Sequence, residues 1–398
     1  MKRQAFVAGL GAAGAAGMAI RANAQVRFAT PLPQGNQYPN QFLTQYTIGV
    51  CVTLSGPFGK YGNEVVRGVQ AAVDESNRFT TPIGHVWGLR AYDDRNDTAQ
   101  AQSNPSIAAA DSTVIGIVGN LTKAMTLAAL SRYANVGFAV VVPSVTADTI
   151  TARGYHNIFR LPSKDTSAGT LFGSTVLEHK RGTSALAVAL DGDYGSDVAR
   201  GFVQGAKTNH VNADVLLFPQ SGFDPAAAAR SVLDRSPDYV FFAGKTPELG
   251  PLAEALRLEK FTGDMGASDG FYNSETIATY AATLDGGFVA SNLPPLNRVP
   301  SAIGILTDFE HEMGAITALS AYGYAAAQVI ISIAARAGAA SRFSVLTAMQ
   351  RNPSFTTLVG QYGFNTNGDP LIPNIYIYQV GKKGFTFSRP AIRNGFVL

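Results

Sequence analysis

The chain is poor in cysteine and histidine, the residues that form disulfides and bind zinc. It has one cysteine, Cys51, which excludes an internal disulfide. Cys51 lies in the apolar run 47–54, so we expect a buried strand residue and not a reactive thiol. Five scattered histidines show no metal-ligand spacing: His85, His156, His179, His210 and His311. No metal site is predicted.

Catalytic and nucleotide-binding motifs are also missing. The sequence contains neither a P-loop nor a G-x-S-x-G elbow. A G-x-G-x-x-G match at 9–14 lacks the carboxylate that a dinucleotide site needs about 20 residues later. The pair Asp93-Asp94 follows a predicted strand and is interpreted as a helix-capping and linker-anchoring pair. These absences predict a protein that is not an enzyme and needs no cofactor.

The amino-terminal segment has the pattern of an export signal. Lys2 and Arg3 precede an uncharged run over 5–20, and Ala22-Asn23-Ala24 has the small-x-small pattern of a signal-peptidase site. The run is too short and too weakly apolar for a membrane span, which needs about 20 apolar residues. We therefore predict a signal peptide over 1–24, and the pattern leaves the Sec and Tat export routes both open.

Cleavage of this signal peptide changes the charge balance. The whole chain has 31 basic and 28 acidic residues, and cleavage removes three basic residues and no acid, which leaves 28 of each. No block of Lys or Arg stands out, so nucleic acid is not an expected partner. The Gln-, Pro- and Asn-rich segment 25–45 is predicted to be a flexible leader. An exported chain whose cysteine is not at the cleavage point is expected to be a periplasmic protein without a lipid anchor.

Strand patterns alternate with helical patterns from Tyr46 onward. The rhythm runs to Val142 and then restarts, so the sheet-forming unit occurs twice. The uncharged run 316–335 is interpreted as a long helix packed in a lobe, because its polar residues dilute the hydrophobicity of a membrane span. We predict two Rossmann-like, doubly wound α/β lobes joined by crossing hinge strands, with lobe 1 over 46–164 and 293–368 and lobe 2 over 165–292 and 369–398.

Polar loops follow the predicted strands at their carboxyl ends, where open parallel sheets bind ligands. They offer hydroxyls, backbone N–H groups, aromatic rings, two ammonium groups and a carboxylate. This inventory predicts a site for a small zwitterion or anion. The loops are 55–62, 119–123, 143–146, 191–195, 244–248 and 268–270.

Eight stretches, taken in order, resemble the branched-chain amino acid (leucine/isoleucine/valine) binding protein family of ABC importers. They are TLSGPFGKYG (53–62), YDDRND (92–97), VGNLT (118–122), VPSVTAD (142–148), RGYHNIFRLPSKD (153–165), DGDYG (191–195), AGKTPELG (243–250) and FNTNGD (364–369). The resemblance spans residues 47 to about 388. It implies a type I periplasmic-binding fold.

The resemblance also implies a function. The expected protein is a monomeric solute receptor that binds a small carboxylate, an amino acid in the first instance, in the cleft between the lobes. It would deliver this solute to an ABC permease complex at the inner membrane. Two alternatives stay open: a non-amino-acid carboxylate, either an aromatic acid or a dicarboxylate, and a ligand sensor of a regulatory system.

The ligand-binding residues of the family map by resemblance onto seven positions. Tyr61 would line the pocket, the Ser144 carbonyl would accept from the α-amino group, and Thr146 would contact both carboxylate and amino group. Tyr194 matches an aromatic residue of the second lobe, and Asp269 matches the acid that pairs with the α-ammonium. The remaining two positions depart from the family: Lys123 stands in place of a serine and Lys245 in place of an aromatic residue.

The two lysines leave the ligand open. If both face the cleft, they favour an extra anionic group on the ligand. If Lys245 pairs with Asp269, it cancels the ammonium site and favours a plain or aromatic carboxylate. One or both lysines can instead point to solvent, because lysine is seldom buried unpaired. Asp97 and Thr122 stand at the positions of the family's disulfide, so that staple is lost.

Overall fold

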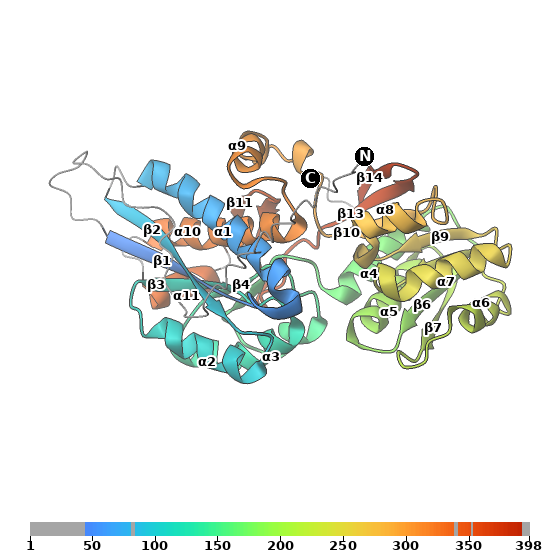
Figure 1. The fold of residues 1–398 in the computed structure, drawn as a ribbon, viewed down its shortest axis with the longest axis horizontal. Helices are drawn as coiled ribbons and strands as arrows, with labels where there is room; N and C mark the ends of the chain where they lie inside the picture. Colours follow the sequence, from blue (N-terminus) through green and yellow to red (C-terminus); the bar gives the residue numbers. More distant parts are fainter. Residues whose placement is uncertain (1–43, 81–83, 338–340, 352, 392–398) are drawn as a thin grey trace, which may run out of the picture.

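Two α/β lobes lie side by side along the long axis of the molecule (Figure 1). The computed structural model describes residues 44–80, 84–337, 341–351 and 353–391. The predicted signal peptide and the G-x-G-x-x-G match lie outside the described residues. Of the predicted leader, Thr44 and Gln45 are described and already belong to the first strand.

The first lobe contains a parallel sheet in the order β2-β1-β3-β4-β5. Helices cover both faces, which explains why strands such as β3 are buried along their whole length. One face packs against α1 and α10 and the other against α2 and α3. The strands are β1 (Thr44–Val52), β2 (His85–Asp93), β3 (Val114–Gly119), β4 (Val140–Val142) and β5 (Ile158–Arg160). The other elements associated with this lobe are η1 (Gly56–Phe58), α1 (Gly59–Thr80), α2 (Thr98–Ala109), α3 (Lys123–Val136), η3 (Asp148–Ile150), α9 (Ile303–Met313), α10 (Ala318–Ala337), α11 (Arg342–Gln350), β11 (Phe355–Thr357) and β12 (Gly360–Tyr362).

The second lobe repeats this strand order and extends it. Its sheet runs β14-β13-β10-β9-β8-β6-β7, in which β7-β6-β8-β9-β10 are parallel and follow the order of the first sheet. The remaining two strands, β13 and β14, are antiparallel and form a hairpin near the carboxyl terminus. The strands are β6 (Ser184–Leu190), β7 (Asn212–Phe218), β8 (Tyr239–Phe242), β9 (Asp264–Ala267), β10 (Phe288–Ser291), β13 (Ile375–Gly381) and β14 (Gly384–Ala391). Helices α4 (Asp165–Val176) and α5 (Asp193–Thr208) pack on one face, and α6 (Pro225–Leu233), α7 (Thr246–Leu258) and α8 (Ser274–Tyr280) on the other; η4 (Asp269–Phe271) follows β9 and η5 (Leu296–Arg298) follows β10.

Two expectations about apolar segments are met. Helix α10 has the length and hydropathy of a membrane span, but 67% of its most apolar window is buried inside the protein, where it packs against α1 and the first sheet. Cys51 is a fully buried residue of β1. Burial raises the pKa of its thiol to about 12. A hydrogen bond with Tyr133 opposes this rise in pKa and the charge of Asp94 adds to it, so Cys51 stays an unreactive thiol.

The segments that cross between the lobes are tied to one another by side chains. The backbone N–H of Ser163 donates to Asn292 Oδ1 (2.9 Å), and the N–H of Asn374 donates to Ser163 Oγ (2.9 Å). Ser163, Asn292 and Asn374 belong to three different crossings, after β5, after β10 and before β13. The crossings therefore form one hydrogen-bonded joint.

A buried ion pair fixes the chain beside this joint. Arg160, at the end of β5, is fully buried and its Nε lies 2.6 Å from Asp369 Oδ1. Its Nη1 donates to the carbonyl oxygens of Thr146 and Ala147, both at 2.8 Å, and its Nη2 donates to Thr151. Asp369 thus contacts the first lobe, although the predicted first lobe ends one residue earlier, at residue 368. The division of the chain into two lobes with those boundaries stays a prediction.

We expect Gly68→Ala to loosen the contact between α1 and α10. A Cβ at residue 68 would lie 1.9 Å from the carbonyl oxygen of Ser320, so the helices must separate. The free energy of unfolding should fall by about 1–3 kcal/mol in urea denaturation. Gly304→Ala in α9 is the control, because no atom of the described residues lies within 4 Å of the added carbon. Equal effects of the two substitutions would contradict the close approach.

We expect Asp369→Ala to destabilise the protein strongly, because it leaves the guanidinium of Arg160 buried without a counter-charge. The free energy of unfolding should fall by about 3–5 kcal/mol. Asp264→Ala is the control: it breaks an exposed pair with Lys180, which should change stability by at most about 1 kcal/mol. Similar losses in the two variants would show that the buried pair has no special weight.

Candidate functional site

The seven predicted ligand-binding residues follow the carboxyl ends of six strands. Tyr61, Lys123, Ser144 and Thr146 come after β1, β3 and β4 of the first sheet. Tyr194, Lys245 and Asp269 come after β6, β8 and β9 of the second sheet. In each lobe these strands include the pair at which the strand order reverses, β1/β3 and β6/β8, which is where ligands bind in open α/β sheets.

Tyr194 and Asp269 are in direct contact. The Tyr194 hydroxyl donates to Asp269 Oδ1 and lies 3.1 Å from Ser268 Oγ. Asp269 Oδ2 accepts from the side-chain amide of Asn292 at 2.9 Å. Burial, and then the charge of Asp269, raises the pKa of Tyr194 well above its usual value, so the hydroxyl remains a donor. The carboxylate of Asp269 is therefore oriented by two neutral donors.

Asn292 was not predicted as a site residue. It lies in the crossing after β10, and it donates to Asp269 while it accepts from the backbone of Ser163. Its own carbonyl accepts from Tyr322 at 2.7 Å. Pro294, Pro295 and Pro300 follow it in the sequence, a cluster typical of a linker and not of a binding site. The structure therefore connects the predicted ammonium-binding carboxylate to the joint between the lobes.

In the first lobe, backbone carbonyl groups fix two of the predicted residues, Ser144 and Thr146. Ser144 Oγ donates to the carbonyl oxygen of Leu121 (2.9 Å), which connects it to the loop that carries Lys123. The carbonyl oxygen of Thr146 accepts from Arg160 and from the backbone N–H of Asp165 (3.0 Å). Lys123 is the first residue of α3 and is half-buried.

Two predicted residues are largely exposed. Tyr61 is 43% exposed, and the ammonium of Lys60 lies 4.8 Å from the centroid of its ring. The Lys245 side chain is 60% exposed, and its ammonium lies 3.2 Å from Glu248 Oε1. Lys245 thus pairs with Glu248 and not with Asp269. The alternative in which Lys245 cancels the ammonium site is not the arrangement of this structure.

A second carboxyl, Asp165, lies beside these residues and was also missed as a site residue. It is the first residue of α4 and is 1% exposed, and no described residue donates a hydrogen bond to its Oδ2. Burial raises its pKa to about 8; a hydrogen bond with Thr146 opposes this rise, and the charges of Asp269, Asp148 and Asp197 add to it. The stretch 153–165 that carried the family resemblance contains this residue, but nothing in it indicated burial.

Asp93 and Asp94, predicted to cap a helix and anchor a linker, anchor loops within the first lobe. Asp93 Oδ1 accepts from the backbone N–H of Leu54 (2.8 Å), and Asp94 accepts from the Thr53 hydroxyl and the Asn120 amide. Their predicted role as helix caps was wrong.

The helix caps stand at the positions of the lost disulfide instead. Asp97 caps α2 by accepting from the N–H of Gln100, and Thr122 caps α3 by accepting from the N–H of Met125. The side chains that replace the disulfide therefore bond to the backbone that follows them.

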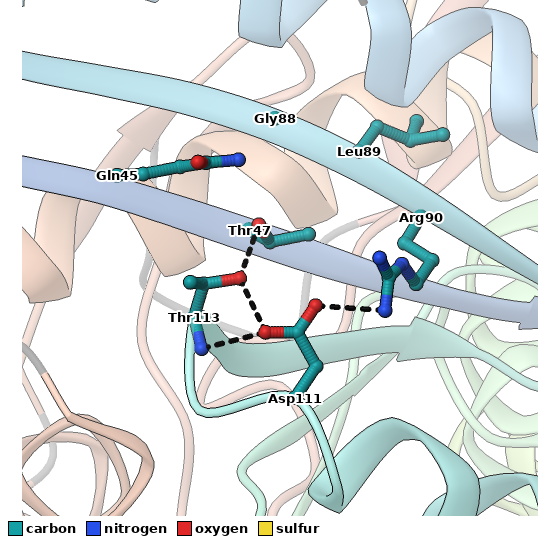
Figure 2. Close-up of a pocket in the computed structure, with 7 residues that line it drawn as sticks. All are labelled: Gln45, Thr47, Gly88, Leu89, Arg90, Asp111 and Thr113. Atoms are coloured by element: carbon teal, nitrogen blue, oxygen red, sulfur yellow. Dashed lines mark hydrogen bonds and ion pairs between the residues drawn. The ribbon is translucent and has the colours of Figure 1, made fainter. Parts of the chain in front are cut away.

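A small pocket on the first sheet lies away from these loops (Figure 2). It is lined by residues from the first half of β1, the middle of β2 and the segment before β3, among them Gln45, Arg90 and Asp111. Burial opposes ionisation of Asp111, but hydrogen bonds from Thr113 and the charge of Arg90 hold its pKa below the usual value. The carboxylate is already paired with Arg90 at 2.8 Å, so the pocket offers no free charge of Asp111 to a ligand.

Known proteins resemble this chain over most of its length. The family model for periplasmic binding proteins matches residues 45–385. The Leu/Ile/Val-binding protein BraC3 of Rhizobium johnstonii is 27% identical over 340 residues, which cover 84% of this chain and 91% of that relative. The Leu/Ile/Val-binding protein homolog 1 of Brucella melitensis is 24% identical and covers 83% of this chain and 89% of that relative.

Solved structures share the fold. A leucine-binding protein from Thermotoga maritima superposes with a TM-score of 0.73 at 21% identity, over 88% of this chain and 99% of that one. A solute-binding protein of an ABC transporter from R. palustris, in complex with benzoate, has a TM-score of 0.69 at 16% identity, over 88% of this chain and 97% of that one. The two-lobed type I fold and the match over 45–385 lead to one conclusion: the chain belongs to the periplasmic binding protein family.

Proposed function

We propose that this protein is the periplasmic solute receptor of an ABC importer, that it does no chemistry, and that it binds an amino acid between its lobes. The ligand would contact Tyr61, Ser144, Thr146, Tyr194 and Asp269, with Lys123 and Lys245 at the edge of the site. The observation that carries the proposal is the carboxylate of Asp269. Neutral donors orient it, and no basic side chain among the described residues forms an ion pair with it, so a ligand ammonium would supply the opposite charge.

The first lobe supplies what the other end of an amino acid needs. A ligand carboxylate is stabilised by backbone N–H groups at a helix start and by hydroxyl donors. The start of α3 at Lys123 offers backbone donors of this kind, and Ser144 and Thr146 follow β4 of the same lobe. The two ends of the ligand would thus be held by different lobes. Only the closed form would make both contacts, so ligand binding would favour closure.

A second candidate is a carboxylate without an ammonium group. Structural neighbours from R. palustris were solved with benzoate and with 4-hydroxybenzoate, on the same fold. In that case the lysines, and not Asp269, would determine the ligand. The two candidates make opposite predictions for the same substitutions.

We expect neutral amino acids to stabilise the mature protein, residues 25–398, in a thermal-shift screen that also contains acidic amino acids, dicarboxylates and aromatic acids. A ligand at 100 times its dissociation constant adds about 2.7 kcal/mol to the free energy of unfolding. Asp269→Asn should abolish the shift. Asp264→Asn, at the start of β9, is the matched control and should retain it, because Asp264 is 57% exposed and pairs with Lys180.

Two results would contradict the amino-acid proposal. Shifts restricted to aromatic acids or dicarboxylates, lost in Lys123→Ala or Lys245→Ala, would establish the second candidate. The absence of a shift with every compound would remove support for both ligand classes.

Tyr194→Phe should weaken amino-acid binding by about tenfold or more, because a hydrogen bond to a charged group contributes about 1.5–3 kcal/mol. Isothermal titration calorimetry measures the dissociation constant. Tyr272→Phe is the control, since its ring packs against Tyr378 and Phe385, and its backbone N–H bond to the Asp269 carbonyl does not involve the hydroxyl that is removed. An unchanged dissociation constant in Tyr194→Phe would show that the orientation of Asp269 does not matter for the ligand.

A further inference from the structure

Three aspartates from separate elements meet beside the first crossing between the lobes. Asp148 opens η3 after β4, Asp165 opens α4, and Asp197 lies in α5. One carboxylate oxygen of each lies within 4.8 Å of one oxygen of each of the others. Since η3 belongs with the first sheet and α5 packs on the second, the cluster bridges the two lobes.

The basic side chains at the cluster pair with Asp148 and Asp197. Lys164 Nζ lies 3.9 Å from Asp148 Oδ2, and Arg200 pairs with Asp197. Both basic side chains are exposed, at 38% and 58%. Asp148 also accepts from the backbone N–H of Thr166 (3.1 Å) and from its hydroxyl (2.6 Å).

Asp165 is different from its two neighbours. It is 1% exposed and its Oδ2 accepts no hydrogen bond within the described part of the chain. A buried carboxylate with an unsatisfied oxygen is costly unless a cation or a donor reaches it. A ligand of the cluster is therefore the simplest explanation for keeping an acid at this position.

We propose that Asp148, Asp165 and Asp197 bind a hard divalent cation, with calcium as the best-fitting ion. Three carboxylates form an oxygen-only ligand set, which suits calcium or magnesium and not zinc. Two oxygens on one calcium ion, each at about 2.4 Å, can be up to about 4.8 Å apart, whereas magnesium at about 2.1 Å needs a tighter set. The ion would connect η3, α4 and α5 and so clamp the lobes at their joint.

Calcium titration by isothermal calorimetry tests this proposal on the mature protein after removal of metal with a chelator. We expect saturable binding of about one ion per chain, in line with one oxygen cluster, together with a calcium-dependent rise in the melting temperature at constant ionic strength. Magnesium should bind more weakly. Because the titration contains no amino acid or other solute, its outcome does not depend on the proposed solute.

Asp165→Asn and Asp197→Asn should each abolish calcium binding and the rise in melting temperature. Asp165→Asn should still fold, with a melting temperature in chelator equal to or above that of the parent chain, because it removes an unsatisfied buried carboxyl. Asp214→Asn is the matched control: its carboxylate is 74% exposed and pairs with Arg235, so calcium binding should persist. No saturable binding by the parent chain, or unchanged binding by Asp165→Asn, would overturn the proposal.

Discussion

One buried guanidinium holds together three stretches of chain at the carboxyl end of the first sheet. Arg160 bonds to Asp369, to the carbonyl oxygens of Thr146 and Ala147, and to Thr151. A planar guanidinium can serve these acceptors at once because its donors point in fixed directions. Since no water reaches Arg160, every one of these acceptors must stay in place to satisfy the charge.

The remainder of the site depends on that fixed point. The carbonyl of Thr146, held by Arg160, also accepts the backbone N–H of Asp165 and so determines where α4 begins. The second lobe then packs on α4 and α5, and Asn292 returns across the joint to bond both Ser163 and Asp269. A movement at the joint therefore changes the orientation of the Asp269 carboxylate.

Negative charge is distributed unevenly around this joint. Asp269 is oriented by Tyr194 and Asn292, two neutral donors, and keeps its charge available. Asp165, whose pKa the charge of Asp269 helps to raise, is buried with one oxygen unsatisfied within the described part of the chain. Two acids in a poorly solvated region favour the approach of positive groups. This preference is common to the proposed solute ammonium and the proposed cation.

The sequence by itself determined the strands and helices whose apolar residues recur at regular spacing. Alternating strand and helix patterns predicted two doubly wound lobes and the packing of α10 inside one of them. Burial of one face of a strand or one stripe of a helix leaves a periodic pattern within a single segment. Motif resemblance predicted the family and located seven loop residues at strand ends. Short strands are marked more weakly: β9, Asp264–Ala267, has no β-branched residue, and only the polar loop after it, 268–270, indicated where it ends.

The tertiary structure alone decided which side chains are partners. Arg160 and Asp369 are 209 residues apart, yet they form the pair on which the first lobe's loops depend. The same holds for Asn292 with Asp269 and for the meeting of Asp148 with Asp197. The sequence of one segment shows only the periodic spacing of its own apolar residues. Charge pairing and burial at a joint arise when distant segments pack, and they therefore leave no signal in any one of those segments.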